Sequence, residues 1–132
     1  MRRLGGELYD TYMQADRIEI VGIAASGVHG VYADEAEDAQ PFVVDAVLWT
    51  NVSEAVASDR LESTIDYVAA SGLVQQIVEA SHAKLIETLA DELCQALLTN
   101  VHALAVQVTV HKPRAARDAR AADVSITLTR TR

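Results

Sequence analysis

Hydrophobic and polar residues alternate in four stretches of the chain, which is the spacing of β-strands with one face buried. The alternation predicts strands over residues 17–23, 41–52, 101–112 and 122–130. The second of these is apolar on both faces, so we expect it to be covered on both sides. Residues 26–40 and the polar stretch 113–121 are predicted to be loops.

Apolar residues recur every three or four positions in the middle of the chain, as on one face of an α-helix. This spacing predicts helices over residues 67–82 and 83–100. Asp66 is placed to cap the first helix, and Asn100 can end the second in the left-handed conformation. The apolar stripe of the second helix consists of Leu85, Ile86, Leu89, Leu93 and Leu97.

The predicted order of elements is β-β-α-α-β-β, two hairpins around a pair of helices, which indicates an α+β fold. We expect one four-stranded antiparallel sheet with both helices on one face. The pattern predicts no third layer for the other face, so oligomerisation is expected to cover it. Residues 15–132 should form a single domain, and residues 1–14 an N-terminal extension that need not be ordered.

Charge and composition argue against several classes of partner. The formal net charge of −8 disfavours nucleic acid and anionic membrane surfaces, because both attract basic proteins. No apolar run reaches the length that spans a membrane. Arg2 and Arg3 resemble the start of a signal peptide, but no apolar segment of the kind that a signal peptide needs follows them. The single cysteine, Cys94, cannot form a disulfide within the chain, which fits a reducing cytoplasm.

One lysine lies where the strand pattern calls for an apolar residue. In the stretch VQVTVHKP, Val106, Val108 and Val110 share one face of the predicted strand. Lys112 continues that face, and Pro113 then ends strand pairing because it has no N–H to donate. The amine either extends to water from the strand end or faces inward because it has a chemical role. Spacing alone leaves both interpretations open.

The other candidates for a functional site are weak when taken singly. Glu35 lies in an acidic loop, Tyr67 begins a predicted helix, and Glu87 lies in the first turn of the next helix. A solvated charge, a half-buried aromatic ring and a favourable helix-dipole interaction would explain them as well. The four histidines lack metal-binding spacing, so we expect no zinc site. No Walker, dinucleotide or G-x-S-x-G motif is present.

Four motifs in order resemble bacterial dihydroneopterin aldolase. They are GVHGVYADEAEDAQPFVVDAVLW, STIDY, KLIETLADEL and VTVHKP, and the resemblance covers about residues 15–130. It implies the tunnelling fold, in which four subunits close a barrel and two rings stack into a homo-octamer with active sites between neighbouring subunits. It also implies a cytoplasmic enzyme of folate biosynthesis that binds a pterin substrate and uses no metal or cofactor.

The reaction implied by the resemblance is an aldehyde-lyase reaction. 7,8-Dihydroneopterin would undergo retro-aldol cleavage to 6-hydroxymethyl-7,8-dihydropterin and glycolaldehyde. Neither a metal nor a lysine Schiff base is needed, because the conjugated N5=C6 imine of the substrate accepts the electrons. Epimerisation at C2′ is a conceivable side reaction, since the enol intermediate could recombine with glycolaldehyde.

The resemblance also implies three catalytic roles. Lys112 matches the lysine that acts with an ordered water on the side-chain hydroxyl and supports charge at N5. Glu35 matches the glutamate that positions this lysine and water. Tyr67 matches the tyrosine that transfers a proton to the enol intermediate.

Substrate binding is implied at two further places. Glu87 matches the carboxylate that accepts hydrogen bonds from the 2-amino group and N3 of the pterin. The backbone from Ile86 to Thr88 would assist it. Asp66 lies where additional backbone contacts with the pterin are expected.

The sequence is also compatible with two alternative functions. After the lysine, RAARDARAAD replaces the Pro- and Ile-containing run of many relatives. Its arginines, Arg114, Arg117 and Arg120, could meet phosphates, which would suit an epimerase acting on dihydroneopterin triphosphate. The same departure would suit a catalytically poor paralogue that serves as a pterin-binding ring subunit.

Overall fold

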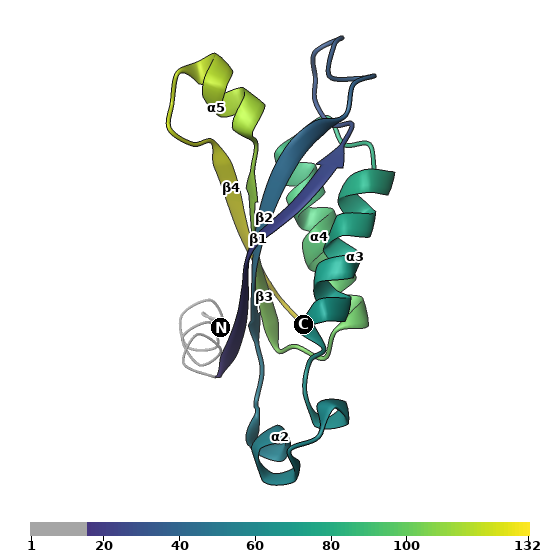
Figure 1. Cartoon of the computed structure of the whole chain (residues 1–132), viewed down its shortest axis with the longest axis vertical. Helices are drawn as coiled ribbons and strands as arrows, with labels where there is room; N and C mark the ends of the chain where they lie inside the picture. Colours follow the sequence, from purple (N-terminus) through teal and green to yellow (C-terminus); the bar gives the residue numbers. More distant parts are fainter. Residues whose placement is uncertain (1–15) are drawn as a thin grey trace.

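The computed structural model describes residues 16–132, so the predicted extension over residues 1–14 lies outside the described part. Four antiparallel strands form one sheet in chain order. They are β1 (Arg17–Gly27), β2 (Gln40–Trp49), β3 (Ala105–His111) and β4 (Ser125–Thr131). Two long helices, α3 (Tyr67–Ala80) and α4 (Ile86–Asn100), lie on one face of this sheet (Figure 1). The predicted α+β architecture is therefore confirmed.

The sheet has an inner face, covered by α3 and α4, and an outer face turned away from them. Because side chains alternate along the strands, the apolar ones lie on the inner face, where burying each Val, Leu or Phe stabilises the fold by roughly 1.5–3 kcal/mol. The strand residues of this core, each at most 1% exposed, are Phe42, Val44, Ala46, Leu48, Val106, Val108 and Val110. The buried helix residues include Val74, Val78, Leu89, Leu93 and Leu97.

The two ends of the sheet carry different connections. At the end that we call the loop end, Gly27 pairs with Gln40 across β1 and β2. At the crossover end, Trp49 pairs with Ala105 across β2 and β3. The connection from β2 to α3 holds α2 (Ser53–Ser58) and a 3₁₀ turn, η2 (Leu61–Ser63). Helix α3 runs from the crossover end to the loop end, and α4 returns (Figure 1).

The prediction of a loop over residues 113–121 was wrong, because Pro113–Ala119 forms a helix, α5. Proline is favoured at the start of a helix, where its missing N–H costs nothing, and alanine and arginine are good helix formers. Arg120 ends α5 in the left-handed conformation with φ 57°. Helix α5 lies at the loop end, on the outer side of the sheet (Figure 1).

Several element boundaries also differ from the prediction. β1 continues to Gly27, past a bulge between Ile20 and Ile23 where Gly22 has φ +80°, a conformation that suits glycine. β3 begins at Ala105 rather than at residue 101. Asn100 does not end α4 in the left-handed conformation, because the next residue is extended and the Asn100 amide donates to Ala96 O. Leu85 precedes α4 and is 49% exposed, so it does not belong to the apolar stripe.

The outer face is polar across β3 and β4. Gln107 Nε2 donates to Thr129 Oγ1 at 3.1 Å, and the hydroxyls of Thr109 and Thr127 lie 2.8 Å apart. Cross-strand pairs of this kind stabilise a sheet whose face meets water. Cover of this face by another subunit stays a prediction. None of the helices within residues 16–132 is long and apolar enough to cross a membrane.

Candidate active site

Lys112 directly follows β3 and points to the inner side of the sheet. Its Nζ lies 2.8 Å from Oε2 of Glu35, and the two side chains are only 12% and 14% exposed. The amine therefore meets a carboxylate rather than open water, and a chemical role for it stays a prediction. Two of the predicted catalytic residues, 77 positions apart in the chain, form one ion pair.

Glu35 is held by three hydrogen bonds. Its Oε1 accepts the Tyr32 backbone N–H at 3.3 Å, and its Oε2 accepts Gln40 Nε2 at 3.2 Å in addition to Lys112. Burial acts to raise the pKa of this carboxyl, but the hydrogen bonds from Lys112, Gln40 and Tyr32 outweigh it and lower the pKa below 4.5. Glu35 is therefore ionised at neutral pH.

Two residues that shape the Glu35 loop were not among the predicted site residues. A side chain at Gly30 would place its Cβ 2.2 Å from Glu35 Oε1, so only glycine lets the carboxylate approach the backbone here. Gln40 is 1% exposed and donates to both Glu35 and the His29 carbonyl. The alternation of strand residues could have pointed to Gln40, because Gln40 lies on the inner face of β2 with Phe42. Lys112 lies on the inner side of β3 in the same way.

His29 anchors the same loop to the connection between α3 and α4. Its Nε2 lies 2.8 Å from the Val78 carbonyl oxygen, which can only accept, and its Nδ1 accepts the Ala83 N–H at 2.9 Å. These partners define the neutral tautomer with the proton on Nε2. The ring is 1% exposed and has both nitrogens engaged, so it serves the structure of the loop.

A cavity of about 370 Å³ opens beside the ion pair of Lys112 and Glu35. The loop that carries Glu35 forms one wall, and α5 forms the other. The charged residues around it are Lys112, Arg114, Arg117, Asp34, Glu35 and Asp118, three basic and three acidic. A cavity with balanced charge suits a neutral heterocycle better than a polyanion.

The predicted pterin-anchoring residues lie at the start of α4, also at the loop end. Glu87 and Thr88 are exposed, and Ile86 is half-buried at the first helical position. An exposed carboxylate in the first turn of a helix is free to accept hydrogen bonds from a ligand. The structure therefore places Glu87 at the same end of the molecule as Lys112 and Glu35.

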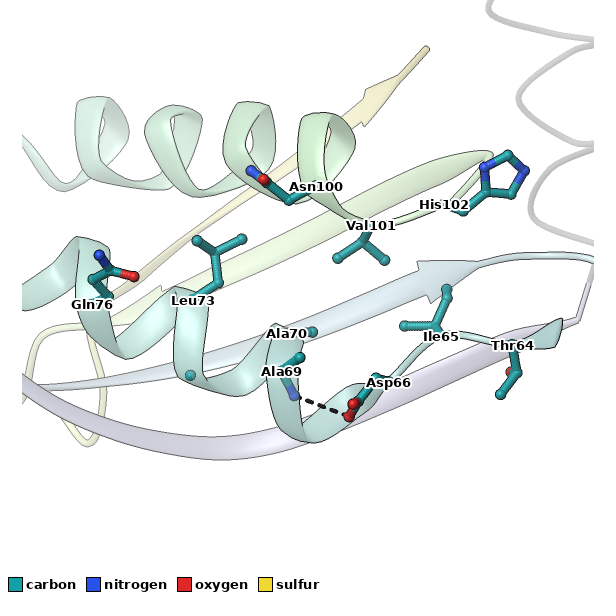
Figure 2. Close-up of a pocket in the computed structure, with 11 residues that line it drawn as sticks. Thr64, Ile65, Asp66, Ala69, Ala70, Leu73, Gln76, Asn100, Val101 and His102 are labelled. Atoms are coloured by element: carbon teal, nitrogen blue, oxygen red, sulfur yellow. Dashed lines mark hydrogen bonds between the residues drawn. The ribbon is translucent and has the colours of Figure 1, made fainter. Parts of the chain in front are cut away.

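Asp66 and Tyr67 lie at the other end. Asp66 caps α3 by accepting the Val68 and Ala69 N–H groups, both at 3.1 Å, as predicted. Figure 2 shows the hydrogen bond from Ala69. It lines a second cavity of about 570 Å³, between the start of α3 and the end of α4 (Figure 2). Tyr67 begins α3 and is 59% exposed. Fourteen residues of α3 separate the two ends, roughly 21 Å of helix, so one chain does not bring Tyr67 to Lys112.

The described residues give little support for a metal site or for a cysteine nucleophile. Within residues 16–132, no group of three or more His, Cys, Asp or Glu side chains is arranged to hold a metal ion. Cys94 is buried in the core, and this burial raises the pKa of its thiol to about 11. A buried thiol of that kind is a poor nucleophile.

Comparison with known proteins gives consistent similarities. The family model described as "FolB: Dihydroneopterin aldolase" matches residues 18–129. A dihydroneopterin aldolase of Streptomyces coelicolor is 38% identical over 117 residues, which are 89% of this chain and 98% of that protein. The Escherichia coli dihydroneopterin aldolase in complex with neopterin has a TM-score of 0.81 at 27% identity, covering 87% of this chain and 98% of that chain. A FolB protein of Vibrio cholerae shares the fold, with a TM-score of 0.84 at 24% identity over 90% of this chain and 99% of that chain.

Proposed function

This chain belongs to the dihydroneopterin aldolase family and has the family's function, and we propose that Lys112, Glu35 and the Tyr67 of a neighbouring copy carry out its retro-aldol reaction. The substrate is 7,8-dihydroneopterin, and the products are 6-hydroxymethyl-7,8-dihydropterin and glycolaldehyde, in folate biosynthesis. The observation that carries the assignment of residues is the 2.8 Å ion pair of Lys112 and Glu35 beside an open cavity.

The cleavage breaks the C1′–C2′ bond of the substrate side chain. Loss of the proton from the C2′ hydroxyl releases glycolaldehyde, and the electron pair of the broken bond moves through C6 to N5. The resulting enol then takes a proton at C1′ to give the hydroxymethyl product. Because the substrate's own conjugated imine holds the electrons, the protein needs only to move protons and stabilise charge.

The lysine and glutamate supply the first half of this sequence. Lys112 would act through an ordered water on the C2′ hydroxyl and would support negative charge at N5. Glu35 is held at both carboxylate oxygens, so it fixes the position of the Lys112 amine within hydrogen-bonding distance. A fixed donor directed at developing charge is worth more than a mobile one, because it does not reorganise during the reaction.

The proton transfer at C1′ requires a second copy of the chain. Tyr67 matches the family's proton-transfer tyrosine, but it lies at the crossover end, together with Asp66. If the loop end of one copy meets the crossover end of the next, each site receives Lys112, Glu35 and Glu87 from one chain and Tyr67 and Asp66 from its neighbour. β1 and β4 are the edges of this sheet, so a head-to-tail ring could form by pairing them.

We therefore propose a homo-oligomer with sites between subunits, as a tetrameric ring and as an octamer of two stacked rings. The enzyme would act in the cytoplasm as an aldehyde-lyase, with no metal, cofactor, nucleic acid or membrane partner. The triphosphate epimerase and the inactive ring subunit are not favoured, because the matched relatives are dihydroneopterin aldolases. The balanced charge of the cavity also argues against a triphosphate.

The direct experiment is to supply the purified protein with 7,8-dihydroneopterin and, separately, with its triphosphate. Glycolaldehyde is trapped and quantified, and the pterin products are separated by chromatography. Release of glycolaldehyde from the unphosphorylated substrate supports the proposal. A C2′ epimer formed from the triphosphate, without cleavage of dihydroneopterin, would support the epimerase instead.

Glu87→Gln is expected to weaken pterin binding more than it slows cleavage. The neutral amide can accept only one of the two hydrogen bonds, from the 2-amino group and N3, that the carboxylate accepts together. Hydrogen bonds to a charged group contribute about 1.5–3 kcal/mol, so Kd for neopterin should rise roughly 10- to 150-fold. Glu92→Gln, on the same helix, is the matched control. An unchanged Kd in Glu87→Gln would show that the pterin is anchored elsewhere.

A further inference from the structure

His111, the residue before Lys112, lies in a charged cluster on the outer face of the sheet. Its Nε2 is 2.7 Å from Asp45 Oδ2, and its Nδ1 is 2.8 Å from Asp123 Oδ2. Carboxylates can only accept, so both ring nitrogens must carry protons and the ring is an imidazolium. The hydrogen bond to Asp45 is the main cause that raises the pKa of His111 above 6.5, Asp123 adds to it, and burial opposes it. We call Asp45, His111 and Asp123 the outer-face clamp.

The outer-face clamp connects β1, β2 and β3 with the segment that leads into β4. Asp45 belongs to β2, His111 ends β3, and Asp123 lies two residues before β4. Asp45 Oδ1 also accepts the N–H of Gly22, in the bulge of β1, at 2.8 Å. Burial acts to raise the pKa of Asp45, but the hydrogen bonds from His111 and Gly22 outweigh it and lower the pKa below 3.8. Asp45 is therefore ionised at neutral pH.

The outer-face clamp fixes the backbone on both sides of Lys112. The Lys112 N–H donates to the carbonyl of Val124, the residue after Asp123, at 2.9 Å. The Lys112 carbonyl accepts the Ala116 N–H at 3.1 Å and thereby starts α5. Successive strand residues point to opposite faces, so His111 reaches the outer face while Lys112 reaches Glu35 on the inner one.

We propose that His111 is a positioning residue, through which the outer-face clamp holds Lys112 at the geometry that cleavage requires. This inference rests on the catalytic role proposed above for Lys112. His111 itself is turned away from the cavity that holds Lys112 and Glu35, so it does not touch the substrate. Its effect is transmitted through one peptide unit, from a ring fixed by two carboxylates to the next side chain along the strand.

The protonation state of His111 determines whether the outer-face clamp is intact. The neutral imidazole has only one N–H, so deprotonation releases either Asp45 or Asp123. The other charged group that lines the same cavity as His111 is Arg117 of α5, and β1 contributes only Val21 and Gly22 to it. Since the folded-state pKa of His111 is raised, the outer-face clamp is intact below pH 6.5 and opens as the pH rises through that higher pKa. The turnover number kcat should fall over the same range.

The test compares His111→Gln with wild type, using glycolaldehyde release as the assay. Glutamine has a single donor group and no charge, so kcat is expected to fall roughly 10- to 100-fold, the range that a small misplacement of a catalytic group produces. KM should change by less than about twofold, because the pterin-binding residues are untouched. The fall of kcat above pH 6.5 that is assigned to His111 should be absent from this variant.

Two further variants keep the test decisive. Asp123→Asn retains the size and one acceptor of the aspartate, so it serves if His111→Gln does not fold, and it should lower kcat by a smaller factor. Asp91→Asn is the matched control, because it breaks the partly exposed ion pair of Asp91 with Arg130, 3.3 Å long, between α4 and β4. It should leave kcat and its pH dependence unchanged. Circular dichroism and gel filtration report whether each variant is folded and assembled.

The inference is overturned if folded His111→Gln or Asp123→Asn retains the kcat and pH profile of wild type. It is also overturned if kcat falls only in proportion to the unfolded fraction, since that is what a merely structural residue would do. Lys112→Ala, measured in parallel, separates this from failure of the proposed function. An active Lys112→Ala enzyme would remove the catalytic premise, whereas an inactive one beside an unaffected His111→Gln would reject only the positioning role.

Discussion

Lys112→Ala is expected to lower the rate of glycolaldehyde release from 7,8-dihydroneopterin by at least roughly a hundredfold, which corresponds to about 2.7 kcal/mol of activation free energy. The variant loses the proposed donor at N5 and leaves Glu35 as a partly buried carboxylate without its amine partner. Pterin binding should change far less, because Glu87 and its neighbouring backbone, the proposed pterin anchor, are intact. Stopped-flow or trapped-aldehyde assays would measure the rate, and fluorescence titration with neopterin the affinity.

Lys112→Arg sharpens this first prediction. A guanidinium keeps the positive charge and the ion pair with Glu35, but it does not lose a proton in proteins, so it cannot pass one to or from a water. We expect this variant to fold and bind pterin as wild type does, yet to cleave it slowly. If Lys112→Arg were as fast as wild type, the lysine would act only as a fixed charge.

Two inactive variants are expected to restore each other's activity when they assemble together. Lys112→Ala keeps Tyr67, and Tyr67→Phe keeps Lys112, while these residues lie at opposite ends of the sheet within one subunit. In a ring assembled at random from equal amounts, half the chains supply Lys112 and half of their neighbours supply Tyr67. About a quarter of the sites should then be complete, so co-expressed chains should recover roughly a quarter of wild-type activity.

The control for complementation is the same pair of variants, purified separately and mixed after assembly. Without exchange of subunits, this mixture should show only the sum of the two residual activities. If the co-expressed chains also show no more than that sum, Lys112 and Tyr67 do not work together across an interface. The account of a site shared between copies would then be wrong.

The sequence was most informative where periodicity decides which face a residue takes. The parity of Val106, Val108 and Val110 predicted that Lys112 continues the inner face, and the structure confirms that it does. Asp66 was predicted to cap a helix because a short acidic side chain just before an apolar helical pattern can accept hydrogen bonds from the free N–H groups of the first turn. The alternation typical of strands and the three-to-four-residue spacing typical of helices likewise predicted the four strands and the two long helices.

Contacts between distant segments were harder to predict. The ion pair of Lys112 with Glu35 depends on a loop whose shape is set by Gly30, Gln40 and the buried ring of His29. Of these three residues, only Gln40 has a periodic signal, and that signal does not show which groups it contacts. The outer-face clamp was missed because His111 and Asp45 are 66 positions apart, and only the register between β2 and β3 brings them together. Charge pairing of this kind follows from tertiary structure.

Helix α5 was missed for a different reason. Its polar, arginine-rich sequence shows no apolar stripe, and its position between two strands favoured a simple hairpin loop. The local signals were present, however, in Pro113 at the first helical position and in a run of good helix formers. Only Ala116 of this helix is buried, so propensity and capping, rather than core packing, define it.

The central claim is that this chain cleaves 7,8-dihydroneopterin by proton transfer at a site built on Lys112 and Glu35. The most direct measurement incubates wild-type protein with that substrate in excess chelator and quantifies both products. The account predicts glycolaldehyde and 6-hydroxymethyl-7,8-dihydropterin in equal amounts, at a rate that the chelator does not change. Tight binding of the pterin without either product, or cleavage that the chelator abolishes, would contradict it.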